Sequence, residues 1–294
     1  MAGSVNKVIL IGRLGKDPEL EHTSGGNPMA RFTLATDEVF KDRSGEQQRR
    51  TEGHTIIAWS KLAEICGEYL TKGRQVCVEG SIRSRQWEDQ SGNKRTAYEI
   101  VARQMTMLGS RADSERASAA SAERDQAHRP SSAEPGPEPE IADSVNKVFL
   151  IGRLGKDPEL KYTPSGAPVA KFSLATDEVF KDRSGEQQKH TEWHNIVAWN
   201  KLAEICGEYL TKGKQVYIEG SIRSRQWEDQ SGNKRTAYEI VARQMTMLGS
   251  KADSERAASE RPAGDRPASD HPAEPEPTSE PAAEPEITDS DIPF

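Results

Sequence analysis

The sequence SVNKVILIGRLGKDPEL, residues 4–20, returns almost unchanged as SVNKVFLIGRLGKDPEL at residues 144–160. The correspondence continues without a gap to Ala112 in the first copy and Ala252 in the second. A repeat of this length predicts two copies of one domain, each long enough to bury a small core of its own.

Charge divides the chain into four segments, although the whole chain carries a net charge of −7. Residues 1–112 hold 17 Lys and Arg against 14 Asp and Glu, and residues 144–252 hold 17 against 13. Residues 113–143 hold 3 against 8, and residues 253–294 hold 3 against 12. The repeats are therefore basic domains that could bind a polyanion. The two acidic segments are rich in Ala, Pro, Ser and Glu, which predicts a disordered linker and a disordered tail.

Composition also excludes several classes of protein. The start, MAGSVNKV, has no signal-peptide pattern, and no apolar stretch reaches membrane-spanning length, so we expect a cytoplasmic protein. Cys66, Cys77 and Cys206 are odd in number and form no C-x-x-C pair, which indicates neither a disulfide framework nor a zinc site. We expect no cofactor.

The first repeat contains five strand patterns and one helix pattern. Apolar and β-branched residues predict strands over five segments: Val5–Leu14, Ala30–Ala35, Thr51–Trp59, Gln75–Trp87 and Thr96–Leu108. Between the third and fourth, one apolar helix face is formed by Leu62, Ile65, Cys66, Tyr69 and Leu70. The order β-β-β-α-β-β predicts an oligonucleotide-binding (OB) fold, a five-stranded Greek-key barrel present twice in tandem.

The fourth strand places two cations and an aromatic on one face, because successive strand residues point to opposite sides. These residues are Arg83, Arg85 and Trp87, and in the second repeat Arg223, Arg225 and Trp227. An aromatic surface beside phosphate contacts is typical of proteins that bind single strands. The alternative, a Trp that fills the barrel, would bring two arginines into the core.

The third strand of the second repeat carries two tryptophans on one face, Trp193 and Trp199, about 20 Å apart at the usual strand rise. They are placed to contact different bases, although Trp199 and its counterpart Trp59 could instead pack locally at the strand end. In the first repeat Gly53 replaces Trp193, so one stacking position is missing there.

Further candidates lie in loops and at the helix ends. Phe40 and Phe180 follow the second strand beside basic residues, which suits single-stranded nucleic acid, although either ring could fold back onto its barrel. The lysines that flank the helices are candidate phosphate contacts, with an ordinary solvated helix end as the alternative: Lys61, Lys72, Lys201 and Lys212.

Several of these motifs together resemble the bacterial single-stranded DNA-binding protein family: VNKVILIGRLGKDPEL, FTLATDEVFKD, KLAEICGEYLTKG, VEGSIRSRQWEDQSG and the terminal DIPF. The resemblance implies base stacking by Phe40, Trp59, Trp87, Phe180, Trp193, Trp199 and Trp227. Gly53 departs from the pattern. The resemblance to the family further implies binding and protection of single-stranded DNA at the nucleoid during replication, recombination and repair. Four such domains per assembly are also implied, which this chain would reach as a homodimer.

The end of the chain resembles that family's partner-recruiting tip. Aspartates, an aliphatic and aromatic pair and a free carboxylate are combined in Asp289, Asp291, Ile292, Pro293 and Phe294. A basic pocket on a partner could take the charges while a hydrophobic cleft takes the apolar side chains. A tail that serves solubility alone would explain the charge but not the apolar tip.

Two other classes of function compete with this interpretation. An RNA-binding OB-fold protein is the main alternative, because stacking and backbone contacts do not exclude a 2′-hydroxyl group. A nuclease or other metal-dependent enzyme would need clustered carboxylates or histidines on the binding face, and the sequence shows none. His54 and His194 alternate away from the tryptophans and are predicted to be packed or interface residues. We therefore expect a binding protein and not an enzyme.

Overall fold

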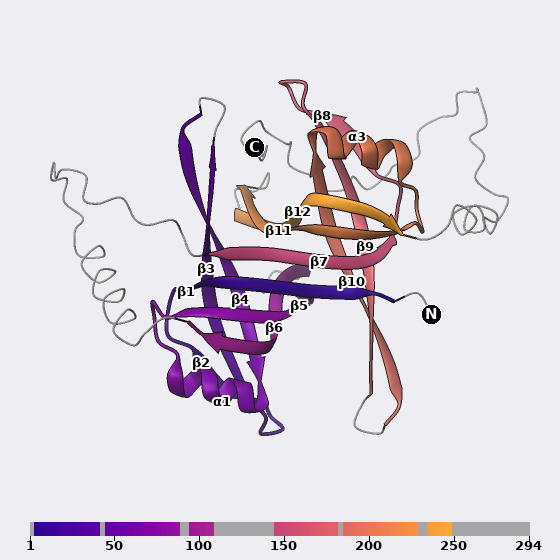
Figure 1. Ribbon diagram of the computed structural model, residues 1–294. Helices are drawn as coiled ribbons and strands as arrows, with labels where there is room; N and C mark the ends of the chain where they lie inside the picture. Colours follow the sequence, from indigo (N-terminus) through magenta and orange to yellow (C-terminus); the bar gives the residue numbers. More distant parts are fainter. Residues whose placement is uncertain are drawn as a thin grey trace, which may run out of the picture.

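The computed structural model describes residues 3–41, 45–88, 94–108, 144–181, 185–228 and 234–248, in which each repeat forms six strands and one helix (Figure 1). The first repeat contains β1 Val5–Leu14, β2 Glu19–His22, β3 Pro28–Lys41, β4 Gln47–Trp59, α1 Ser60–Tyr69, β5 Gln75–Glu88 and β6 Lys94–Met107. The second contains β7 Val145–Leu154, β8 Glu159–Tyr162, β9 Pro168–Lys181, β10 Gln187–Trp199, α3 Asn200–Tyr209, β11 Gln215–Glu228 and β12 Lys234–Leu248. The predicted linker and acidic tail lie outside the described residues.

Five of the six strands in each repeat close into a barrel. β1 pairs antiparallel with β5 and also meets β3, where Arg13 is opposite Ala35. β4 and β6 complete the ring as a parallel pair, with Ile56 opposite Ile100. The same pairings recur in the second repeat. The predicted fold class, two tandem five-stranded oligonucleotide-binding barrels with one helix each, is confirmed.

Strand β1 passes very close to β3 where the barrel closes. Its alternation turns Val8, Leu10 and Leu14 into the core. A Cβ at Gly12 would lie 2.2 Å from the carbonyl oxygen of Ala35, far inside van der Waals contact. Glycine is therefore required here so that the two backbones can meet.

The helix packs against β3 and β4, and its buried side chains are Ala63 and Cys66. Burial raises the pKa of the Cys66 thiol to about 11, as expected for a small core residue. Tyr69, which the periodicity placed on the apolar face, is 55% exposed, so that assignment was wrong. The helix ends at Tyr69, and the extended residue Leu70 turns inward and is buried instead.

Two strand features differ from the sequence prediction. The short strand β2 was missed because all four of its residues are exposed, which leaves no apolar alternation to detect. β3 and β4 are also longer than the apolar pattern, and they stay paired from Met29 opposite Trp59 to Lys41 opposite Gln47. We call the protruding parts of the two hairpins the arms: residues 36–41 with 47–52, and residues 176–181 with 187–192.

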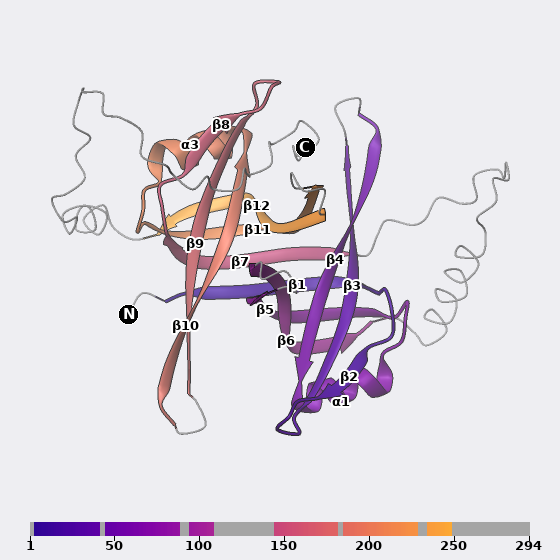
Figure 2. The ribbon, with the colours of Figure 1, turned by 180° about the vertical axis from the view of Figure 1, so that it is seen from behind.

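The two barrels are joined directly through β1 and β7, which pair antiparallel with Val8 opposite Val148. These valines are equivalent in the repeats, so the junction has two-fold symmetry of the kind found in homodimers. All strands thereby form one 12-stranded sheet. Each arm reaches past the junction and lies beside the other repeat (Figures 1 and 2). Sequence spacing gave no indication of this crossing.

Candidate nucleic-acid interface

Each arm is fixed to the opposite repeat by a buried glutamate. The Glu52 carboxylate accepts hydrogen bonds from the backbone N–H and the hydroxyl of Ser224, at 3.0 and 2.7 Å. Glu192 accepts the equivalent pair from Ser84, at 3.1 and 2.8 Å. The carboxylates are almost fully buried, so these charge-assisted bonds hold the arms where they cross.

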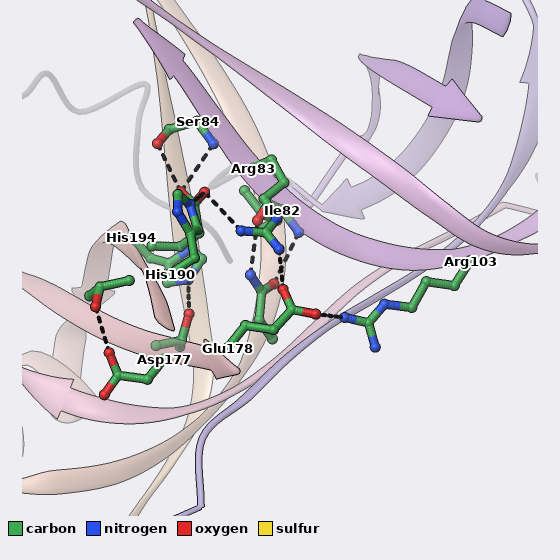
Figure 3. A network of polar contacts seen from close by, with 12 residues as sticks. Ile82, Arg83, Ser84, Arg103, Asp177, Glu178, His190 and His194 are labelled. Carbon is green, nitrogen blue, oxygen red and sulfur yellow. Dashed lines mark hydrogen bonds and ion pairs between the residues drawn. The ribbon is translucent and has the colours of Figure 1, made fainter. Parts of the chain in front are cut away.

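Arg83 and Arg223 take part in the contact between the repeats. Arg83 forms ion pairs with Glu178 of the opposite arm and, at 3.6 Å, with Glu192 (Figure 3). Arg223 lies 3.9 Å from Glu38 of the other arm. The sequence placed both arginines on a phosphate-binding face but could not show that acidic residues of the other repeat meet them there. Their role in nucleic-acid binding stays a prediction.

Trp193 directly follows the arm residues of β10 and is 51% exposed. Its ring lies over Gly155, where an added Cβ would come within 2.3 Å of the indole Cζ3 atom. The indole therefore has one supported face and stays accessible, which is the arrangement that base stacking requires. Gly53 holds the same position in the first repeat, where an added Cβ would make an ordinary contact of 3.8 Å with the Cγ2 atom of Thr33.

The tryptophans at the ends of β4 and β10 differ sharply in exposure, since Trp59 is 41% exposed and Trp199 only 7%. Trp199 packs into a cluster with Val169, Val197 and Val241. Local packing, the alternative that the sequence left open, is what the structure shows for Trp199, whereas Trp59 presents its ring to solvent.

Phe40 lies in a pocket that both repeats form. This pocket has a volume of about 270 Å³ and is lined by Phe40 and Glu38 of the first repeat with Trp199, Arg223 and Arg243 of the second. The equivalent Phe180 is 47% exposed. The equivalent phenylalanines of the two arms therefore differ in environment, since Phe40 lines a pocket and Phe180 is exposed to solvent.

The other predicted contacts have simpler surroundings. Arg85 is exposed and Arg225 is half-buried, and the side chains of Trp87 and Trp227 lie outside the described residues. Lys61 and Lys201 are exposed and form ion pairs with Glu64 and Glu204 at 3.1 and 2.8 Å. The backbone N–H of Lys72 donates a hydrogen bond to the carboxylate of Asp17, and that of Lys212 donates one to Asp157.

His54 and His194 are buried at the boundary between the repeats, as their alternation predicted. The Nε2 atom of each is hydrogen-bonded at 2.8 Å to a threonine hydroxyl of the same repeat. Burial lowers the pKa of both imidazoles to about 4. They line a small cavity together with Tyr98 and Tyr238, whose ring centroids are 5.8 Å apart. The histidines are thus neutral packing residues near pH 7.

Sequence reasoning missed Arg103 and Arg243, which also meet the opposite arms. Arg103 forms an ion pair with Glu178, and Arg243 forms one with Glu38. Each arginine is the extra residue of a β-bulge, because the register shifts between Glu79 and Gly80 and at the equivalent point of β11. A bulge redirects a side chain, and a glycine inside a strand pattern was the available signal.

Across the described parts of the chain, no group of three or more His, Cys, Asp or Glu side chains is arranged to hold a metal ion. Nor does any helix there have the length and apolar character needed to span a membrane.

Comparison with known families decides what kind of protein this is. Residues 5–108 and residues 145–248 each match the single-strand binding protein family. The chain belongs to that family. Its membership places the chain among binding proteins and not among enzymes. The double match also agrees with the repeat found in the sequence.

Relatives and solved structures support the family assignment. The single-stranded DNA-binding protein of Neisseria meningitidis serogroup A is 53% identical over 115 residues, which cover 39% of this chain and 66% of the relative. Single-stranded DNA-binding protein 1 of Chlorobaculum tepidum is 57% identical over 112 residues, which cover 38% and 69%. The crystal structure of the wild-type single-stranded DNA binding protein from Thermus aquaticus is 26% identical, with a TM-score of 0.62 over 85% of this chain and 95% of that one. That coverage runs through both repeats.

Proposed function

We propose that this chain binds single-stranded DNA with little preference for sequence. The observation that carries the proposal is the exposure of three large aromatic side chains, Trp59, Phe180 and Trp193, on basic domains. Each base that stacks on such a ring contributes about 1–3 kcal/mol, whatever its identity. Membership of the single-strand binding family and the names of its relatives support the same conclusion.

Affinity measured for mixed and homopolymeric strands across a salt series tests the proposal. We expect similar affinities for the different sequences, together with a marked loss of affinity as salt rises, because phosphate neutralisation releases counterions. A preference for duplex DNA, or for one short sequence, would contradict the proposal.

RNA binding is the alternative, because base stacking by these aromatics does not depend on the sugar. Parallel titrations with DNA and RNA oligomers of equal sequence decide between the two. Tighter binding of the DNA oligomers supports the proposal, and tighter binding of the RNA oligomers overturns it.

We further propose that two chains form a homodimer that presents four domains. Support comes from the outer face of the β1–β7 junction, where the partly exposed Ile9, Ile11, Phe149 and Ile151 form an apolar strip that Lys7 and Lys147 interrupt. A second copy would cover this strip. Light scattering with and without oligo-dT measures both the number of subunits and the stoichiometry of binding.

The proposed biological role is protection of single-stranded DNA at the nucleoid during replication, recombination and repair, with partners recruited by the tip Asp289–Phe294. The tip lies outside the described residues, and the support is its combination of acidic and apolar groups. Removing the tip is expected to abolish the capture of partners from cell extract while affinity for single strands is kept. Capture of the same partners by the truncated chain would show that the domains carry the interaction.

A further inference from the structure

Two equivalent charge clusters lie where the arms cross the opposite repeats. In one, the Glu178 carboxylate lies between Arg83 and Arg103 and forms an ion pair with each (Figure 3). In the other, Glu38 forms an ion pair with Arg243 and lies 3.9 Å from Arg223. The two arginines of a cluster always come from one repeat, and the carboxylate comes from the other.

Each cluster combines one enclosed arginine, Arg83 or Arg223, with one arginine at the surface, and Arg83 is further engaged by the buried Glu192 at 3.6 Å. Arg103 and Arg243 remain more than half exposed, so an anion from solution can approach them. Guanidinium groups bind carboxylates and phosphates with the same planar pair of donors. A glutamate in this position therefore has the charge and the hydrogen-bonding geometry of a phosphate group.

An aromatic surface lies beside one of these clusters. The pocket that contains Phe40 and Trp199 is also lined by Glu38, Arg223 and Arg243. A nucleotide needs a ring for its base and a cation for its phosphate, and this pocket supplies both. One side of the pocket comes from each repeat, so neither domain could form it alone.

We propose that the arginine pairs Arg83–Arg103 and Arg223–Arg243 are phosphodiester-binding sites, which Glu178 and Glu38 occupy until single-stranded DNA displaces them. The inference rests on the proposed function and adds an intramolecular competitor to it. Displacement is local, because Glu52 and Glu192 hold each arm to Ser224 and Ser84 independently of the exposed arginines. The far end of each arm swings away while its base stays fixed.

The test replaces both competitors in the full chain, as Glu38→Gln with Glu178→Gln, and measures affinity for oligo-dT across a salt series. Glutamine keeps the size of the side chain and removes its charge. We expect affinity to rise at low salt by up to about fivefold for each exposed ion pair that DNA no longer has to break, because such a pair is worth up to about 1 kcal/mol.

A matched control removes the same charge one residue away. Asp37 and Asp177 lie on the same arms, but their carboxylates bind within the arm, to Thr51 and Arg49 or to Thr191 and Lys189. Asp37→Asn with Asp177→Asn is expected to raise affinity by much less. Equal gains in the two double variants would show a general charge effect and overturn the proposal.

A second measurement identifies the arginines. Arg103→Ala with Arg243→Ala, added to the glutamine variant, is expected to cancel the gain and to lower the salt slope by about 0.7 for each phosphate that these side chains no longer neutralise. An unchanged slope would contradict the assignment of these residues. Thermal unfolding of every variant confirms that the domains remain folded. If the wild-type chain binds no single strands at all, the proposed function itself is refuted instead.

Discussion

The two repeats place the same tryptophan in opposite environments. Trp199 is buried among Val169 and Val197, whereas the residues around Trp59 are the larger Met29 and Ile57. Trp199 also lines the pocket that contains Phe40 of the opposite arm, whereas Trp59 stays 41% exposed. Whether an aromatic is available for stacking is therefore decided by its neighbours and not by its presence in a motif.

A second difference compensates for the first. The repeat that buries Trp199 carries the exposed Trp193, and the repeat that has Gly53 in that position exposes Trp59. Each domain thus offers one accessible tryptophan on this strand, at a different point along it. A count of aromatics alone predicts tighter binding by the second domain, because Gly53 replaces Trp193 in the first repeat. That prediction has to be weighed against where the rings lie.

The largest expected effect comes from truncating the two tryptophans separately. Trp199→Ala is expected to lower the free energy of unfolding by about 3–5 kcal/mol, because it empties a packed site. Trp59→Ala is expected to leave stability nearly unchanged and to weaken binding of single strands by about 1–3 kcal/mol. Urea unfolding and oligo-dT titrations of both variants measure the contrast. Equal effects of the two substitutions would break the comparison.

Acid is expected to lower the stability of both repeats through their buried histidines, His54 and His194. The folded-state pKa of His54 and His194 is about 4, below the unfolded value near 6.5, so the unfolded state binds more protons in acid. Their contribution to stability is complete above about pH 6.5 and is lost as the pH falls toward 4. By pH 5 the loss is about 2 kcal/mol for each histidine.

Urea unfolding between pH 7.5 and 4.5 follows this loss. The double variant His54→Gln with His194→Gln serves as the control and is expected to show a flatter profile. The same steepness in both proteins would mean that other groups cause the acid dependence.

Restoring the missing aromatic tests whether the first domain can use both positions. Gly53→Trp is expected to strengthen binding of single strands by about 1–3 kcal/mol. In the second repeat the ring of Trp193 lies over Gly155, and the equivalent Gly15 leaves room for a ring at position 53 of the first repeat. Trp193→Gly is expected to cause the opposite change in the second domain. Quenching of tryptophan fluorescence during oligo-dT titration follows both. No gain from Gly53→Trp would show that the ring is not held open for stacking.

The smallest effect concerns the first helical residue, which has a positive φ in both repeats, 53° at Ser60 and 52° at Asn200. Asparagine tolerates this conformation better than serine does. Ser60→Asn is therefore expected to raise the free energy of unfolding by roughly 0.5 kcal/mol, and Asn200→Ser to lower it by a similar amount. Thermal unfolding of the two variants measures the change, and shifts of the same sign would contradict the explanation.

The fold was predictable because its information is local. Alternation along β1, the apolar face at Cys66 and the turn residues between strands were enough to predict an OB barrel, and the repeat doubled it. The edge strand β2 was not predictable, because exposed residues carry no pattern.

The candidate site was only partly predictable, because its contacts join distant segments. Nothing near Arg83 in the sequence indicates Glu178, which lies 95 residues further along the chain. The different exposure of Trp59 and Trp199 was hidden as well, because the residues that enclose Trp199 come from other strands and from the opposite arm. Residue type and spacing give the candidates for the site, and only the packing of the two repeats shows which of these groups are already engaged.

The two-fold junction at Val8 and Val148 has a consequence for dilution. Subunits of an ordinary dimer separate when their concentration falls below the dissociation constant, because association is bimolecular. Here both halves belong to one polypeptide, so the local concentration of one half around the other is set by the tether and not by the amount of protein present. The continuous sheet, and the crossed arms that depend on it, are therefore expected to persist when the protein is diluted.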